Sequence, residues 1–184
     1  MKKTILAGLA CLAIGAGTAS AQAIVIGGGL AKDCFMEAQA QSTQFTQVED
    51  TCTKALESEV MTRANRAATY VNRGIIRMRS GDYPSALSDY DRAIGLDEEL
   101  GAAYLNRGAA LILSGDHAGA KEALDRAIEL HTNDLHAAHY NRAIAREHTG
   151  DVSGAYYDFL EAAELAPEWD LPQRQLERFT VTQG

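Results

Sequence analysis

Beyond its first residues the sequence has no long apolar run, so no later segment reaches the roughly 20 apolar residues that a membrane-spanning helix needs. The one apolar stretch lies in residues 1–21, MKKTILAGLACLAIGAGTASA, between two lysines and the small residues Ala19-Ser20-Ala21. This layout is typical of a secretory signal peptide. We expect cleavage after Ala21, export to the periplasm, and no membrane insertion of the remaining chain.

A lipid-modified N-terminus is the alternative reading of this leader, because bacterial lipoproteins are cut immediately before a cysteine. Their leaders usually carry leucine three residues before that cysteine, whereas this chain has Gly8 before Cys11. The apolar run also continues past Cys11. Cleavage after Ala21 is therefore the expectation, and lipidation of Cys11 is the competing one.

Basic residues are scarce: Lys and Arg number 17 against 25 Asp and Glu, and the net charge is −8. The leader holds Lys2 and Lys3 and no acid, so its removal lowers the net charge to −10. Binding to a phosphate backbone needs clustered Lys and Arg, and docking on anionic lipid needs them too. The composition therefore argues against nucleic acid and against a lipid surface as partners.

Only three cysteines occur, and none belongs to a C-x-x-C pair. Cleavage of the leader would leave Cys34 and Cys52, each nine residues from Thr43 in a polar stretch between two helix-like segments. Antiparallel helices joined there would bring the two thiols together. In an oxidising compartment we expect a disulfide, which contributes about 3 kcal/mol for a loop of this size; two free buried thiols are the alternative.

Residue patterns that indicate catalysis are missing as well. No nucleophile, base or carboxylate pair stands at a spacing typical of acyl-transfer or phosphate chemistry. The three glycines at 27–29 lack the G-x-G-x-x-G order of a nucleotide-binding fingerprint. We therefore expect neither an enzyme nor a bound cofactor.

What the sequence does contain is one short motif in three copies. It reads VNRGIIRMRSGD from Val71, LNRGAALILSGD from Leu105 and YNRAIAREHTGD from Tyr140. The asparagine at its second position recurs after 34 residues and again after 35. A fixed period of 20 to 50 residues is the signature of a solenoid or a repeat array.

Each copy predicts two helices joined by a tight turn. Apolar residues recur at helical spacing on both sides of a Ser-Gly-Asp or Thr-Gly-Asp sequence, and no copy shows strand alternation. Glycine in the turn permits a positive φ, the aspartate can cap the next helix, and Pro84 suits the first turn of such a helix. The turn residues are Gly81-Asp82, Gly115-Asp116 and Gly150-Asp151.

Small residues occupy matching positions in all three copies. A small side chain lets two helix backbones approach closely while bulky neighbours fill the remaining space. A bulky replacement should therefore overpack the contact and cost about 1–3 kcal/mol. The matching sets are Gly74, Gly108 and Ala143; Ala86, Ala120 and Ala155; and Ala93, Ala127 and Ala162.

These positions resemble the tetratricopeptide repeat, whose pattern is W-x2-L-G-x2-Y, then A-x3-F, then P, over 34 residues. The second copy, for example, has Tyr104, Gly108 and Ala120 at the positions of W, G and A. Arginine replaces the pattern's leucine in all copies, and only the third copy has the proline, Pro167. The resemblance implies an all-α solenoid of three helix-turn-helix repeats, at residues 67–100, 101–134 and 136–169.

The flanking segments are expected to close the ends of the array, because a terminal repeat cannot bury its apolar face alone. Residues 31–66 predict a degenerate helical hairpin as N-terminal cap, with Thr46 and Glu49 as a capping box. Residues 22–30, QAIVIGGGL, predict a flexible lead-in. Residues 170–184 predict a C-terminal capping helix and tail, whose inward-facing residues would be Leu171, Leu176 and Phe179.

In the resembling family, the first helix of each repeat lines a concave groove that often binds peptides or proteins. The recurrent asparagine could bind a peptide backbone through its amide, or it could hold neighbouring helices together. Alanine at positions 68, 102 and 137, in place of lysine, argues against a clamp for a C-terminal carboxylate. The resemblance implies that the groove exposes Val71, Asn72, Ile75, Leu105, Asn106, Ala109, Tyr140, Asn141 and Ile144.

The repeated arginines are expected to pair with the second helices rather than with a ligand. The positions of Arg73 and Asp89 suit such a pair, as do those of Arg142 and Asp158. Ala123 takes the equivalent place in the second copy, which weakens the pattern.

We therefore expect a non-catalytic protein- or peptide-binding scaffold or adaptor in the bacterial periplasm. One alternative is a metal-dependent enzyme, or an accessory subunit, that uses His131, His136 and His139, because two histidines three apart on a helix can share a metal. His139 replaces Tyr70 and Tyr104 of the other copies, which favours packing and no metal. The other alternative is a self-associating structural protein whose repeat ends stack between chains.

Overall fold

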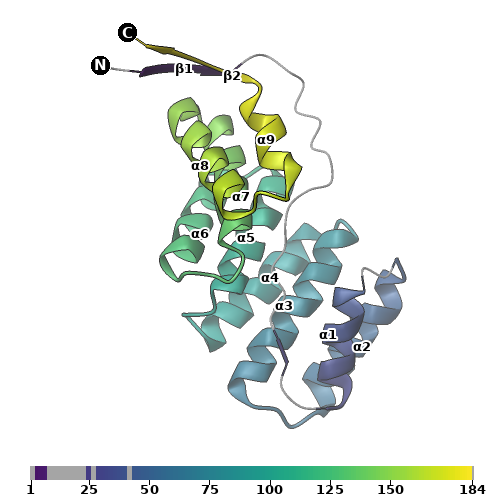
Figure 1. Cartoon of the computed structure of the whole chain (residues 1–184). Coiled ribbons are helices and arrows are strands. Elements are labelled where there is room, and N and C mark those ends of the chain that lie inside the picture. Colours follow the sequence, from purple (N-terminus) through teal and green to yellow (C-terminus); the bar gives the residue numbers. More distant parts are fainter. Residues whose placement is uncertain (1–2, 8–23, 26–27, 41–42, 184) are drawn as a thin grey trace.

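The structure, a computed structural model, describes residues 3–7, 24–25, 28–40 and 43–183 (Figure 1). Most of the expected signal peptide, with Cys11 and the cleavage site after Ala21, and part of the lead-in lie outside the described residues. The described residues form nine helices and one pair of strands. None of those helices is long and apolar enough to cross a membrane. Figure 1 shows antiparallel helix pairs stacked in one array, which confirms the all-α solenoid.

Each of the three repeats is a pair of helices joined by the predicted turn. The turn glycines Gly81, Gly115 and Gly150 have φ of 87°, 89° and 87°. The aspartates that follow accept hydrogen bonds from the backbone N–H three residues on, at 3.2, 2.9 and 2.9 Å. The pairs are α3 (Arg63–Arg79) with α4 (Tyr83–Leu96), α5 (Gly101–Ser114) with α6 (His117–Glu129), and α7 (Leu135–His148) with α8 (Val152–Leu165).

The first repeat begins earlier than its predicted bound of residue 67. Thr62 is the N-cap of α3, and its hydroxyl accepts a hydrogen bond from the Asn65 N–H at 3.1 Å. This side-chain cap satisfies one of the unpaired N–H groups of the first turn, so the helix extends back to Arg63.

The matching small residues lie buried between the paired helices, as predicted. A Cβ on Gly74 would stand 2.5 Å from Cε1 of Tyr90, and one on Gly108 would stand 2.5 Å from Cγ of Leu124. The alanines of the second helices are fully buried as well: Ala86, Ala93, Ala120, Ala127, Ala155 and Ala162. Close approach of the two backbones therefore depends on these positions.

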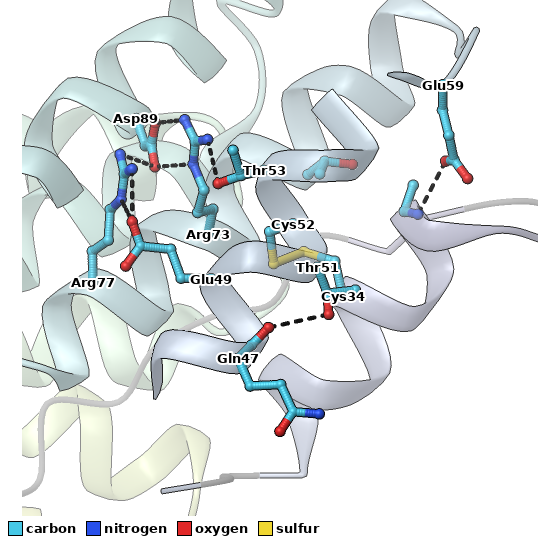
Figure 2. Close-up of a disulfide and its surroundings, with 12 residues drawn as sticks. Cys34, Gln47, Glu49, Thr51, Cys52, Thr53, Glu59, Arg73, Arg77 and Asp89 are labelled. Atoms are coloured by element: carbon cyan, nitrogen blue, oxygen red, sulfur yellow. Dashed lines mark hydrogen bonds and ion pairs between the residues drawn. A yellow bond between two sulfur atoms is a disulfide. The ribbon is translucent and has the colours of Figure 1, made fainter. Parts of the chain in front are cut away.

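The N-terminal cap is the hairpin of α1 (Leu30–Gln39) and α2 (Phe45–Ser58), which packs against α3. A disulfide joins Cys34 to Cys52, whose Cα atoms are 4.8 Å apart and whose side chains are fully buried (Figure 2). The expected capping box at the start of α2 is wrong. Gln44, and not Thr46, is the N-cap of α2, and the carboxylate of Glu49 accepts a hydrogen bond from Arg77 instead of turning back to the start of the helix.

The C-terminal helix is shorter than predicted. Helix α9 (Asp170–Leu176) ends before Phe179, and β2 (Phe179–Gln183) then pairs in antiparallel register with β1 (Lys3–Ala7). The β-branched residues in the sequence FTVTQ favour a strand over another helical turn. The expected inward packing is present, because the array is contacted by Leu171, Leu176 and Phe179.

Candidate functional site

The inner face of the array is formed by the first helix of each repeat. Helix α3 contacts α5, and α5 contacts α7, so these three helices lie side by side along the stack. Each presents an alanine near its start, followed by aliphatic or aromatic side chains in the repeated motif. The inner face is therefore apolar along its length. Those alanines are Ala68, Ala102 and Ala137.

The nine residues assigned to the groove from sequence are buried, contrary to the expectation that they are exposed. Their exposed fractions do not exceed 9%. Val71, Ile75 and Ala109 pack into one apolar cluster, and Leu105, Tyr140 and Ile144 pack into a second. The physical reason is that neighbouring first helices use these side chains to contact each other and the N-terminal cap. Their role in holding a ligand stays a prediction.

The asparagine position is also fully buried in all three repeats. The amide of Asn106 donates a hydrogen bond to the carbonyl oxygen of Ala102, one turn earlier in α5, at 2.8 Å. This hydrogen bond lies within α5 and does not itself join neighbouring helices, so both roles considered for the asparagine stay predictions. It orients the amide along the inner face at the level of Ala102.

A cavity of about 340 Å³ opens on the inner side of the first two repeats. Ala64 and Ala68 of α3 and Ala102 of α5 form its apolar wall. The loops that precede α5 and α7 supply the carboxylate-bearing residues Asp97, Glu99 and Asp134. The cavity therefore combines small apolar side chains with negative charge at its rim. Sequence reasoning did not find it, because it depends on how two loops meet.

The two predicted arginine–aspartate pairs are present and buried. Arg73 donates two hydrogen bonds to Asp89, at 2.9 and 2.7 Å, and Arg77 adds a third at 2.9 Å (Figure 2). Arg142 donates to both oxygens of Asp158, at 2.8 and 2.7 Å. Bidentate geometry of this kind is the strongest arrangement of such a pair. These arginines hold the two helices of their own repeat together.

The environment of Asp158 keeps its carboxylate ionised. Burial alone would raise the pKa of Asp158, but hydrogen bonds from Arg142 and His139 and the nearby positive charges outweigh it. The pKa therefore lies below its ordinary value.

The middle repeat departs from this scheme, as Ala123 indicated. Arg107 has no aspartate on α6 at that position and instead contacts Asp91 of α4, across the boundary between repeats, at 2.9 Å. Side chains of Arg107 and Asp91 are 33% and 60% exposed. Such an exposed pair contributes about 0–1 kcal/mol.

The three histidines of the metal hypothesis have different surroundings. His139 contacts the carboxylate of Asp158 at 3.0 Å, and the ring of His136 stands edge-on to Trp169. His131 lies in the loop before α7, with φ of 50°. Among the described residues, no group of three or more His, Cys, Asp and Glu side chains could hold a metal ion. In the part of the chain that the structure describes, these histidines therefore do not form a three-ligand metal site.

A different histidine pair was missed from the sequence. His117, at the start of α6, stacks on His148, at the end of α7, with ring centroids 3.9 Å apart and planes 7° from parallel. Burial, and then the neighbouring His148, lower the pKa of His117, while Asp116 opposes them. The two residues are 31 apart in the chain, so no local pattern indicates the contact.

A solenoid of helix pairs with an apolar inner face defines the class of this protein as an α-helical repeat protein. A family model described as tetratricopeptide repeat matches residues 71–134 and 114–168, more than half of the chain. The chain belongs to the tetratricopeptide repeat family. A comparison with curated protein sequences finds no match.

Solved structures with the same fold include MamA and the repeat domains of RPAP3. A crystal structure of MamA is 18% identical, with a TM-score of 0.66 and 82% of each chain covered. The second domain of human RPAP3, in complex with the HSP70 peptide SGPTIEEVD, is 24% identical, with a TM-score of 0.59 over 63% of this chain and 96% of that one. The second such domain of Spaghetti (RPAP3), bound to the HSP90 peptide SRMEEVD, is 27% identical, with a TM-score of 0.51 over 54% and 90%.

Proposed function

We propose that this protein is a non-catalytic scaffold that binds an extended segment of another protein along the inner face of its repeats. The observation that carries the proposal is the cavity of about 340 Å³ on that face, with an apolar wall from α3 and α5. Binding sites are usually concave and combine apolar walls with placed polar groups, and this cavity offers both kinds of surface in similar extent. Binding of peptides by RPAP3 domains of the same fold supports the proposal.

The negative charge at the rim of the cavity determines which kind of ligand can bind there. Asp97, Glu99 and Asp134 border the cavity, and the inner-face positions that could carry a lysine clamp hold alanine instead. A negative rim repels an acidic peptide end and attracts a basic side chain or a free amino group. The proposed ligand therefore has small or aliphatic side chains and lacks an acidic C-terminus, unlike SRMEEVD and SGPTIEEVD.

The proposed location is the bacterial periplasm, reached by export with cleavage after Ala21, which would remove β1 and leave β2 without its partner strand in the mature chain. The leader composition supports it, and so does the disulfide between Cys34 and Cys52, since disulfides persist in oxidising compartments. Mass spectrometry of the purified protein tests it. A mature N-terminus at Gln22 supports export with cleavage, whereas lipid on Cys11 would refute cleavage after Ala21.

A pair of alanine variants tests the groove. Ala102→Arg places a long charged side chain in the cavity wall, whereas Ala118→Arg makes the same change at an exposed position of α6. Peptides selected from a random display library on the native chain should bind Ala118→Arg equally. They should bind Ala102→Arg at least tenfold more weakly. Equal binding to both variants, or no enrichment at all, would contradict the proposed function.

A further inference from the structure

Two neighbouring residues of the lead-in, Ile24 and Val25, meet opposite environments. The Ile24 side chain is 69% exposed, whereas that of Val25 is 6% exposed. The pair has no helical or strand assignment. One side chain inward and the next outward is the pattern of an extended segment seated on a surface.

Val25 is buried in an apolar cluster that the first two repeats share with the N-terminal cap. Its side chain joins the apolar cluster that contains Ala68, Val71 and Ile75 of α3 and Ala109 of α5. Ile24 borders the cavity on the same side, next to Ala68 and Ala102. The stretch at residues 24–25 therefore occupies the surface that the proposed function assigns to a ligand.

An anchor fixes the chain where the lead-in meets the cap. The carboxylate of Glu59, in the link between α2 and α3, accepts hydrogen bonds from the N–H groups of Leu30 and Ala31, the latter at 3.1 Å (Figure 2). Gly29 has φ of 85°, and a Cβ there would overlap the Glu59 carboxylate. A negative group at the first turn of α1 is favoured by the helix dipole. Val25 is thus tethered five residues from a fixed point.

We propose that Val25 is an intramolecular ligand, which fills an aliphatic subsite of the groove and competes with an external peptide. The subsite accepts one β-branched aliphatic side chain of an extended segment, and the exposed neighbour points to solvent. This inference rests on the proposed function, because it names the ligand chemistry and the regulation of the same groove.

Because Val25 is covalently tethered next to the groove, weak contacts are sufficient to keep its side chain in the subsite. A tether of a few residues gives an effective concentration of about 1 mM. If the free segment bound with a Kd of about 0.1 mM, the tethered segment would occupy the groove about ten times as often as not. An external peptide would then bind about tenfold more weakly than to an open groove.

The first test measures whether Val25 is held in the groove, without any external ligand. Val25→Cys and Ile24→Cys are made in the full chain and treated with a maleimide, and labelling at each site is followed by peptide mapping. Labelling of Val25→Cys should be at least tenfold slower. Equal labelling rates would overturn the proposal, whatever the outcome of the groove test with Ala102→Arg.

The second test uses the synthetic peptide QAIVIGG, the sequence of residues 22–28, as probe. A buried aspartate is unfavourable, so Val25→Asp should empty the subsite, whereas Leu165→Asp, at an exposed position of α8 away from the cavity, should not. Val25→Ser serves as a milder variant, and thermal melts confirm that each variant is folded. The peptide should bind Val25→Asp or Val25→Ser at least tenfold more tightly than it binds the native chain or Leu165→Asp.

The outcomes separate the two proposals. Slow labelling of Val25→Cys with equal peptide binding to all variants would mean that Val25 is a packing residue, and the intramolecular ligand would be rejected. The proposed function would still stand if library peptides distinguish Ala102→Arg from Ala118→Arg. Loss of that distinction would reject the groove itself.

Discussion

Replacement of Gly74 by alanine tests the packing principle of the array with a single methyl group. Gly74 lies in the interior of α3, where alanine is the better helix former by about 1 kcal/mol. A Cβ there would stand 2.5 Å from Cε1 and 2.9 Å from Cζ of Tyr90. Helix propensity and packing therefore predict opposite signs for the change in stability.

Packing should win at this position. The Tyr90 ring is fully buried, so it cannot move into solvent to make room for the new methyl group. Overpacking of a tight core contact costs about 1–3 kcal/mol. After the gain of about 1 kcal/mol in helix propensity, the expected net loss is up to about 2 kcal/mol.

Urea unfolding followed by circular dichroism measures the difference, with Gly95→Ala as the matched control. Gly95 lies in α4, and nothing stands within 4 Å of a Cβ built on it. Gly95→Ala should therefore raise the free energy of unfolding by up to about 1 kcal/mol, which appears as a higher urea midpoint. A stabilised Gly74→Ala protein would refute the reasoning that close helix approach depends on the missing Cβ.

Three further predictions concern charge and covalent bonds. Asp158→Asn leaves Arg142 and Arg146 without their buried partner and should lower the free energy of unfolding by about 3–5 kcal/mol. Asp91→Asn, at an exposed pair, should lower it by about 0–1 kcal/mol. Urea unfolding measures both, and equal losses would contradict the burial argument. His117 has a pKa below its ordinary 6.5, so the unfolded chain binds its proton first and stability should fall as pH drops below about 6.5. Urea midpoints between pH 7.5 and 5.5 should fall less in His117→Phe, and an unchanged slope would exclude His117 as the source. Reduction of the Cys34–Cys52 disulfide should lower the free energy of unfolding by about 3 kcal/mol. The Cys34→Ser/Cys52→Ser chain, treated with the same reductant, is the control. An unchanged stability of the native chain on adding reductant would show that the bond is not formed.

The array itself could be predicted from sequence because its signals are local and recur. The turn residues Gly115 and Asp116, for example, act on neighbours a few positions away, so a single copy of the motif already specifies the turn. The pair of Arg73 and Asp89 joins two helices of one repeat, and the same spacing recurs at Arg142 and Asp158. Repetition made these long-range contacts visible in one sequence.

The candidate site could be predicted only in part, because its properties depend on contacts between segments. The inner-face residue Val71 was correctly placed on the first helix, but its burial depends on how α3, α5 and Val25 meet. The carboxylate of Glu59 binds α1 across 29 residues, and His148 stacks on His117 across 31. Neither contact recurs in another repeat, so no periodicity indicates it.

Ala123 stands in the central repeat where the outer repeats have Asp89 and Asp158, and this difference affects how easily each repeat deforms. In a solenoid, each repeat is held only by itself and its neighbours, so the stiffness varies along the array with the strength of each unit. Among the described residues, arginine–aspartate pairs join the two helices of each outer repeat through Asp89 and Asp158, whereas no ion pair joins α5 to α6, and the central repeat pairs with its neighbours through Arg107–Asp91 and Arg142–Asp125. The two helices of the central repeat should therefore separate more easily than those of the outer repeats, while its contacts to both neighbours are kept.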